Sequence, residues 1–185
     1  MYDKFYKKFN YSGEELEKLK DVLNQDFILS EKITNTAYEF PKGYGYTTLG
    51  INHIPLLLSK IKAAAPCINQ LIEENIFLAE YFYGKKILSY KISRIFCNKF
   101  FKGCVVSKHK HGSIENNPLL VLALYIYSES DSGNLILHTE EQDIVIPLSP
   151  GDLVVHPGYI PHSVSEYKGN IPRLGLIYEY SLKFD

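Results

Sequence analysis

The chain has 185 residues and a formal net charge of −1, a length sufficient for one compact domain with a substantial core. Its basic residues are interspersed with acidic ones, so we expect no nucleic-acid partner. No apolar stretch approaches a membrane-spanning length, the N-terminus has no signal core and the cysteines show no C-x-x-C spacing, so we expect a cytoplasmic protein with reduced thiols and no membrane partner.

The first half of the chain carries helical patterns. Three helices are expected, over residues 12–23, 54–65 and 66–83. Ser12 and Glu15 have the spacing of a capping box at the start of the first, and Pro66 suits the first turn of the third. Gly84 follows the last helical residue, where a glycine commonly ends a helix. Residues 26–50 contain several glycines and a proline, which indicates loop or irregular strand.

After Gly84 the hydrophobic pattern changes to that of β-strands. Eight short strands are expected, over residues 87–101, 104–109, 119–127, 134–138, 143–148, 153–156, 162–167 and 173–180. The segment 119–127 is apolar almost throughout, which predicts a strand buried on both faces. Helices followed by strands predict a single α+β domain, in which residues 1–84 are mainly helical support and residues 85–185 form a barrel or jelly roll. The helices are expected to pack on one outer face of the sheet.

Three histidines are candidate metal ligands. His109 and His111 form an H-x-H pair at the end of a predicted strand, where residues i and i+2 point to the same face. His162 follows the sequence Pro150-Gly151-Asp152, a short apolar strand and a Pro-Gly turn, which would bring its side chain back inward. Imidazole binds iron, zinc, copper and nickel, so the three histidines predict a metal site. Glu115 is an alternative fourth ligand or base on a loop.

Arg173 is the second informative residue, because an arginine inside an apolar strand is costly unless it is paired. Its planar guanidinium suits a carboxylate. Either Glu166 or Glu179 could be that partner within the chain, or Arg173 could bind an acidic cosubstrate. The remaining histidines are expected to have structural or surface roles; these are His53, His138 and His156.

The pattern resembles that of the iron(II)- and 2-oxoglutarate-dependent oxygenases, which have a double-stranded β-helix, an H-x-D or H-x-E pair, a distal histidine and a later basic residue. His109, His162 and Arg173 match this order, and Asn98, Phe100 and Gly103 resemble the strand that leads to the first histidine. The similarity covers roughly residues 85–182. It implies iron(II) bound by His109, His111 and His162, and 2-oxoglutarate bound by three residues, namely Arg173, Asn98 and Tyr125.

The chain departs from this family at His111, where the family has a carboxylate. The cupin pattern G-x5-H-x-H-x3-E matches Gly103, His109, His111 and Glu115, and its second motif matches residues near His162 in part. The cupin resemblance implies a similar barrel with a metal-dependent dioxygenase or isomerase activity. A barrel that binds a small ligand without catalysis is the third reading.

The oxygenase resemblance implies hydroxylation of a substrate, coupled to conversion of 2-oxoglutarate to succinate and CO2, with ascorbate as an optional reductant. A peptide or small molecule is expected as substrate, and residues 26–60 with the loops at 111–118 and 128–134 are expected to select it. Exposed edge strands would allow pairing into a homodimer.

Overall fold

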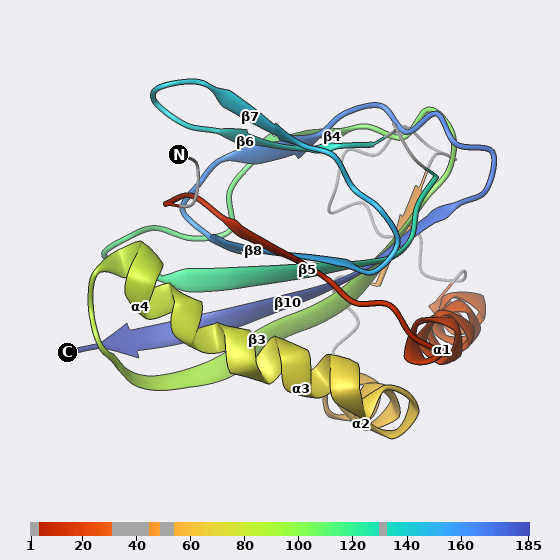
Figure 1. The fold of residues 1–185 in the computed structure, drawn as a ribbon, viewed down its shortest axis with the longest axis horizontal. Coiled ribbons are helices and arrows are strands. Elements are labelled where there is room, and N and C mark those ends of the chain that lie inside the picture. Colours follow the sequence, from red (N-terminus) through yellow and green to blue (C-terminus); the bar gives the residue numbers. More distant parts are fainter. Residues whose placement is uncertain (1–3, 31–44, 49–53, 130–132) are drawn as a thin grey trace.

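Two antiparallel sheets face one another, and helices cover the outer face of the larger sheet (Figure 1). The computed structural model describes residues 4–30, 45–48, 54–129 and 133–185. The six-stranded sheet has the order β1-β8-β5-β10-β3-β2 and the four-stranded sheet the order β4-β9-β6-β7. The strands of the larger sheet are β1 (Lys7–Asn10), β2 (Gly45–Thr47), β3 (Ile87–Phe100), β5 (Leu119–Tyr127), β8 (Asp152–Pro157) and β10 (Arg173–Phe184). Those of the smaller sheet are β4 (Val106–His109), β6 (Leu135–His138), β7 (Asp143–Ile146) and β9 (His162–Val164).

All eight strands predicted after Gly84 are present, and β5 has the predicted bounds. Its expected burial on both faces is confirmed, because Leu122 and Leu124 pack with the helices while Ala123 and Tyr125 pack between the sheets. The strand β1 was not predicted. It pairs with the edge of β8, and its short Lys-rich sequence lacks the apolar alternation that indicates a strand.

The helices cover the outer face of the larger sheet, as expected (Figure 1). They are α1 (Glu15–Ser30), α2 (Ile54–Ala64), α3 (Pro66–Glu74) and α4 (Leu78–Tyr83). The first helix runs beyond its predicted end, and the third predicted helix is broken by a 3-10 turn, η1 (Asn75–Phe77). At this break the Asn75 side chain donates a hydrogen bond to the Leu71 carbonyl at 2.8 Å, and Gly84 ends α4 in the left-handed conformation with φ of 64°. None of the helices in the described segments is long and apolar enough to cross a membrane.

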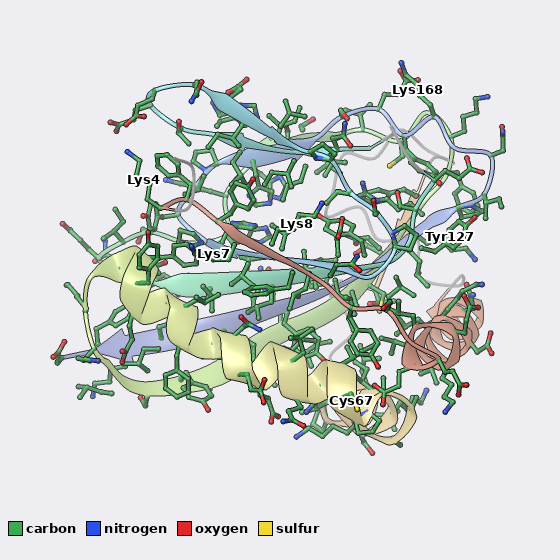
Figure 2. The ribbon with its side chains drawn as sticks, in the orientation of Figure 1. Lys4, Lys7, Lys8, Cys67, Tyr127 and Lys168 are labelled. Carbon is green, nitrogen blue, oxygen red and sulfur yellow. The ribbon has the colours of Figure 1, made fainter. Side chains whose placement is uncertain are left out.

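The predicted capping box at Ser12 is wrong, because Glu15 caps a different helix. Its carboxylate accepts hydrogen bonds from the backbone N–H groups of Cys67 at 3.3 Å and Ile68 at 3.0 Å, at the start of α3; Cys67 is labelled in Figure 2. Partial burial raises the pKa of Glu15, but the bonds from Ile68 and Cys67 outweigh it and hold the pKa below 4.5. The carboxylate therefore joins α1 to α3 through first-turn N–H groups that lack helical partners.

Replacing this cap should destabilise the protein. We expect Glu15→Ala to lower the free energy of unfolding by about 1–2 kcal/mol, because it leaves two helix N–H groups without an acceptor. Glu15→Gln keeps an acceptor oxygen and should lose less. Urea denaturation of both variants measures the difference, and equal losses would show that the hydrogen bonds to α3 are not the cause.

The predicted substrate-selecting segment, residues 26–60, lies largely outside the described residues, as does His53. Residues 31–44 and 49–53 are not described, so the expectation for this segment remains untested. Strand β2, within it, pairs with the end of β3 and so places Thr47 opposite Asn98. The described part therefore lies beside the cavity-forming strands of the larger sheet.

Candidate functional site

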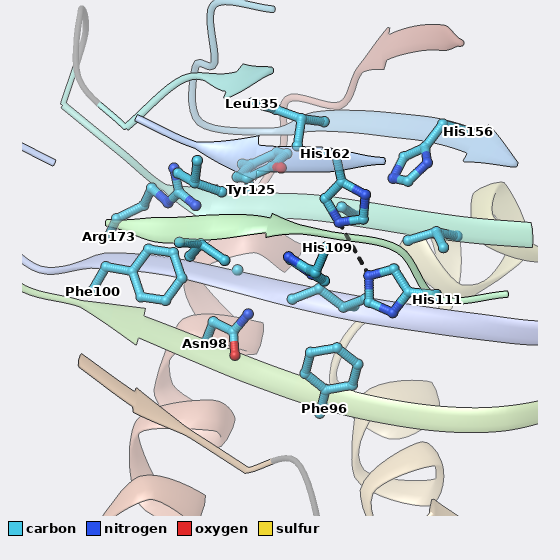
Figure 3. A pocket seen from close by; sticks show the side chains of 16 residues that line it. Phe96, Asn98, Phe100, His109, His111, Tyr125, Leu135, His156, His162 and Arg173 are labelled. Atoms are coloured by element: carbon cyan, nitrogen blue, oxygen red, sulfur yellow. Dashed lines mark hydrogen bonds between the residues drawn. The ribbon is translucent and has the colours of Figure 1, made fainter. Parts of the chain in front are cut away.

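The three predicted metal ligands come together between the two sheets (Figure 3). His109 is the last residue of β4 and pairs with His162, the first residue of β9. His111 lies just beyond β4, where its backbone N–H donates to the Gly158 carbonyl at 3.0 Å. One ligand atom from each of the three imidazoles lies within 4.8 Å of the others. The adjacent strands β4 and β9 thus create a compact cluster of nitrogen donors.

Each of these rings has its Nδ1 next to an oxygen outside the cluster. His109 Nδ1 donates to the Ser107 carbonyl at 2.8 Å, and His162 Nδ1 lies 3.2 Å from the Ile160 carbonyl oxygen. His111 Nδ1 lies 2.7 Å from Glu179 Oε1, which meets the distance of an ion pair but not the angle of a hydrogen bond. A proton on each Nδ1 leaves each Nε2 as the atom available to a metal.

The contact between His111 Nε2 and His162 Nε2 fits a shared cation. These atoms are 3.1 Å apart. If both rings carry their proton on Nδ1, two lone pairs face each other and no hydrogen bond joins them. Two imidazole nitrogens at about 2.1 Å from one metal ion, with a right angle between them, are about 3.0 Å apart. The separation and the all-nitrogen donor set therefore suit a transition metal such as iron or nickel.

Burial favours the neutral imidazoles that metal binding requires. Desolvation holds the pKa of His162 well below 6.5, and the neighbouring histidines His156, His111 and His109 lower it further. Desolvation also lowers the pKa of His109, against the opposing effect of its hydrogen bond to Ser107. Protons therefore compete weakly with a metal ion for both residues at neutral pH.

Arg173 lies in the same cavity, fully enclosed. It begins β10, is 4% exposed, and its guanidinium carbon lies 4.7 Å from the Phe100 ring centroid and 5.1 Å from that of Tyr125. Its Nη1 donates to the Gly133 carbonyl. No carboxylate forms an ion pair with it among the described residues. Desolvation lowers the pKa of Arg173, but a guanidinium remains charged at neutral pH.

The two expected partners of Arg173 within the chain are elsewhere. Glu166 has an exposed side chain, and Glu179 lies further along β10 beside His111. Along a strand a separation of six residues corresponds to about 20 Å, so Arg173 and Glu179 cannot form a pair. A buried cation without an internal anion is costly, and this cost is offset when an anionic ligand enters the cavity.

Asn98 and Tyr125 lie on the two strands that neighbour β10, at the same position along it. Both lie opposite Gly175 of β10, Asn98 from β3 and Tyr125 from β5. Asn98 Oδ1 is buried and has no hydrogen-bond partner among the described residues, so a ligand in the cavity could satisfy this amide. Together with the histidines, Arg173, Asn98 and Tyr125 line one cavity between the sheets, and its empty space, including the open mouth, is about 630 Å³.

Glu115 and His138 do not belong to the cluster. Glu115 is exposed on the loop after β4 and is not among the residues that group around a metal position in the described chain. His138 has the structural role expected of it, because its ring nitrogens contact Asp143 Oδ1 at 2.7 Å and Ser163 Oγ at 2.8 Å.

Two residues of the site were missed by the sequence reasoning. His156 makes the expected local contact, with Nδ1 3.1 Å from the Pro157 carbonyl oxygen, but it also lines the cavity and its ring centroid lies 4.9 Å from that of His162. Glu179 is fully buried. The sequence did contain a signal for Glu179, because every second residue of a strand points to the same face. On β10 this places Glu179 on the face that also carries Arg173, Gly175 and Ile177.

Acid should destabilise the metal-free protein through His156. Desolvation lowers the pKa of His156 from 6.5 to about 3, against the opposing effect of the bond to Pro157. Below about pH 6.5 the unfolded chain therefore binds a proton at this residue that the folded chain does not, so stability falls as pH falls towards the folded value. Between about pH 6 and pH 4, the free energy of unfolding of wild type should fall more steeply than that of His156→Gln, by about 1.4 kcal/mol per pH unit.

This difference is measured by urea denaturation across that pH range in the presence of a chelator. Parallel curves for wild type and His156→Gln would contradict the burial of His156 as a neutral ring.

Comparisons with known proteins give a fold but no sequence family. No protein-family model matches the chain, and no curated protein matches it. An oxidoreductase of the 2OG-Fe(II) oxygenase family from Burkholderia pseudomallei matches 69% of this chain with a TM-score of 0.53 and 19% identity; the chain spans 58% of that structure's length.

Two further solved structures match nearly the whole chain. The viral collagen prolyl hydroxylase vCPH from Paramecium Bursaria Chlorella virus-1, in a 2OG complex, has a TM-score of 0.64 and 12% identity, covering 96% of each chain. HygX from Streptomyces hygroscopicus, with nickel and 2-oxoglutarate bound, has a TM-score of 0.63 and 12% identity, covering 97% of this chain and 84% of that one. The chain therefore has the fold of the 2-oxoglutarate- and iron(II)-dependent oxygenases.

Proposed function

We propose that this protein is an iron(II)- and 2-oxoglutarate-dependent dioxygenase that hydroxylates a peptide or small-molecule substrate, and that its two facing sheets form a double-stranded β-helix. The observation that carries the proposal is Arg173, a buried cation without an internal carboxylate partner in the described chain, in the same cavity as three convergent imidazoles. A metal site alone would fit many functions. A metal site that shares its cavity with a buried guanidinium fits a metal-chelating acid.

His109, His111 and His162 would hold the metal through Nε2. Their Nδ1 atoms lie beside the Ser107 and Ile160 carbonyl oxygens and the Glu179 carboxylate, which fixes the ring orientations before a metal binds. The resulting site has few rotamers to select, so little side-chain entropy is lost on binding.

Arg173 would bind the carboxylate of 2-oxoglutarate that lies far from the metal. The guanidinium can donate to a carboxylate through two parallel N–H groups, and the surrounding Phe100 and Tyr125 rings keep water away from this ion pair. Asn98 and Tyr125 would add hydrogen bonds to the cosubstrate from the neighbouring strands. Gly175, between them, leaves the space that a side chain would fill.

When bound, iron(II) and 2-oxoglutarate would supply the oxidative chemistry with O2 as the oxidant: one oxygen atom would enter the succinate formed as 2-oxoglutarate loses CO2, and the other would enter the substrate as a hydroxyl group. The chain's own contribution is to orient both groups and to exclude water. Apolar side chains from both sheets would exclude the water. Those that line the cavity include Phe96, Val106, Val121, Leu135, Val164 and Ile177. A dry cavity of this kind limits side reactions of a strong oxidant.

The substrate class is drawn from the same fold in other proteins. One similar structure is a prolyl hydroxylase from Trichoplax adhaerens in complex with a hypoxia inducible factor peptide fragment, and another is HygX with hygromycin B bound. Both a peptide and a small polar molecule are therefore compatible with this architecture.

A cupin-type metal enzyme is the second candidate, favoured by the all-histidine donor set. Its pattern match relied on Glu115 as a further ligand, and that side chain is exposed outside the cluster. The cupin pattern also gives no reason why Arg173 is buried in this cavity. Binding of a divalent metal without any binding of 2-oxoglutarate would favour this candidate.

Turnover of the cosubstrate tests the proposal. Purified protein with iron(II), ascorbate and 2-oxoglutarate should form succinate, slowly without substrate and faster with a matching peptide or small molecule. His138→Ala is a suitable control, because this histidine lies outside the cluster and should leave succinate formation intact. Succinate formed at the rate of the protein-free mixture, together with no 2-oxoglutarate binding to the metal-loaded protein, would overturn the proposal.

A further inference from the structure

Glu179 is a buried carboxylate beside His111, and its negative charge has no role in the proposed chemistry so far. It lies on β10, with backbone positions paired to Arg94 of β3 and Val121 of β5. Its side chain is 0% exposed, and Oε1 makes no hydrogen bond of good geometry with any residue in the described parts of the chain. A carboxylate in such a place is costly unless a cation compensates it. One cation, Arg94, lies 3.4 Å from Oε2 but is largely exposed, and a metal ion held by the three histidines would be a second.

The contact with His111 gives the carboxylate a route to the metal. Oε1 lies 2.7 Å from His111 Nδ1, on the opposite side of the ring from Nε2, which lies 3.1 Å from His162 Nε2. A carboxylate at Nδ1 polarises the ring, makes Nε2 a stronger donor and holds the ring in one orientation. Carboxylate, imidazole and metal position therefore form one chain of contacts.

His111, like His109 and His162, is a neutral ligand and brings no charge to the site. Three imidazoles leave the full dipositive charge of the metal within a buried cavity, and 2-oxoglutarate would offset it only when bound. Glu179 is the carboxylate that the structure places against this cluster within ion-pair distance, among the described residues. Both side chains are buried, and the 2.7 Å separation between Glu179 and His111 is short enough for a strong interaction at the reduced dielectric of such a place.

We propose that Glu179 supplies, through His111, the negative charge that a carboxylate ligand would supply directly, and that it positions His111 with Nε2 towards the metal. This inference rests on the metal site of the proposed function. It makes Glu179 a positioning residue, which acts on the metal through another side chain.

A merely structural role for Glu179 would operate through Arg94. Arg94 Nη1 lies 3.4 Å from Glu179 Oε2, but the arginine side chain is 55% exposed, so this ion pair is expected to be weak. Arg94→Gln is therefore the matched control, because it removes that ion pair and leaves the contact with His111 in place.

Metal affinity is the measurement, by titration of the metal-free protein with Ni(II) in a calorimeter and with Co(II) followed by its visible absorption. Glu179→Gln should lower the affinity by about 10–100-fold and shift the Co(II) spectrum, while Arg94→Gln changes the affinity less than about threefold. A second arm uses the His111→Asp background, where two carboxylates would repel each other. There the added Glu179→Gln substitution should raise the metal affinity.

The outcomes separate this inference from the proposed function. Wild-type affinity in Glu179→Gln, or equal losses in Glu179→Gln and Arg94→Gln, would overturn the role of Glu179. If the single variant Glu179→Gln does not fold, the His111→Asp background decides. A lower metal affinity in the double variant than in His111→Asp alone would also overturn the role of Glu179. Wild-type protein that binds metal but not 2-oxoglutarate would overturn the proposed function and leave this inference standing, whereas wild-type protein that binds no divalent metal would overturn both.

Discussion

Arg173→Leu is expected to weaken 2-oxoglutarate binding by at least about 100-fold while metal affinity stays within a few-fold of wild type. The guanidinium would form two charge-assisted hydrogen bonds with the cosubstrate, each contributing about 1.5–3 kcal/mol, and every 1.4 kcal/mol changes affinity about tenfold. Metal affinity should persist, because the three imidazoles come from β4, the loop after it, and β9. Calorimetric titration of 2-oxoglutarate into the nickel-loaded variant measures the loss.

The stability of metal-free Arg173→Leu shows whether a loss of 2-oxoglutarate binding comes from the missing guanidinium or from a damaged fold. Arg173 is buried and has no carboxylate partner among the described residues, so its replacement by an apolar side chain should cost less than about 1 kcal/mol and could stabilise the fold. Arg173→Lys keeps the charge without the planar pair of donors and should fall between wild type and Arg173→Leu. Unchanged 2-oxoglutarate affinity in Arg173→Leu would show that the cosubstrate binds elsewhere.

Gly175→Val tests the same cavity by volume. A Cβ at this position would meet its nearest atoms at 3.7 Å and 3.8 Å, an ordinary contact, so the strand should accept it. The valine methyl groups would fill space between Asn98 and Tyr125, and 2-oxoglutarate affinity should fall although no charge has changed.

His162→Ala is expected to lower metal affinity by about 100–1000-fold, and metal-dependent turnover with it. The estimate follows from apparent metal-binding free energies of about 10–16 kcal/mol in sites with four ligands, or roughly 2.5–4 kcal/mol for each ligand. His162 should be sensitive, because it is buried and its ring lies against those of both His109 and His111. Since a ligand that binds only the folded state raises the melting temperature, Ni(II) should stabilise wild type and have little effect on the variant.

His138→Ala provides the matched control for this experiment. His138 is also a strand histidine, but its ring contacts Asp143 and Ser163 and lies outside the cluster. Its Ni(II)-induced rise in melting temperature should equal that of wild type. Equal Ni(II) responses in His162→Ala and wild type would place the metal somewhere other than this cluster.

Much of the strand half could be predicted from the sequence, because local pattern and burial agree there. The run Leu119–Tyr127 is apolar on both faces since helices cover one side and the smaller sheet the other. The glycine of Pro150-Gly151-Asp152 has φ of 84°, and a Cβ there would lie 1.8 Å from the Tyr11 carbonyl oxygen, so the turn signal reflects a real backbone requirement.

The helical half was less predictable, because tertiary contacts decide its details. The spacing of Ser12 and Glu15 indicated a local cap, yet Glu15 bonds to α3, far along the chain. Strand β1 forms because β8 offers a free edge, a feature that its own four residues do not encode.

The convergence of the three histidines was predictable because H-x-H and a later histidine are local signals, whereas the surroundings of this cluster depend on register. Glu179 was predicted only as an alternative partner for Arg173. The two residues are six positions apart on β10, which is too far for an ion pair. The contact of Glu179 with His111 joins β10 of the larger sheet to the segment just after β4 of the smaller sheet, and a contact between two sheets cannot be derived from sequence spacing alone.

Binding of 2-oxoglutarate with and without a divalent metal tests the central claim most directly. Calorimetric titration into nickel-loaded wild-type protein should show one bound 2-oxoglutarate per chain, with affinity at least about tenfold higher than in the metal-free protein, because the imidazole-bound metal and Arg173 would hold opposite ends of the same molecule. No binding to the metal-loaded protein, or the same affinity with and without metal, would contradict a shared site between His109, His111, His162 and Arg173.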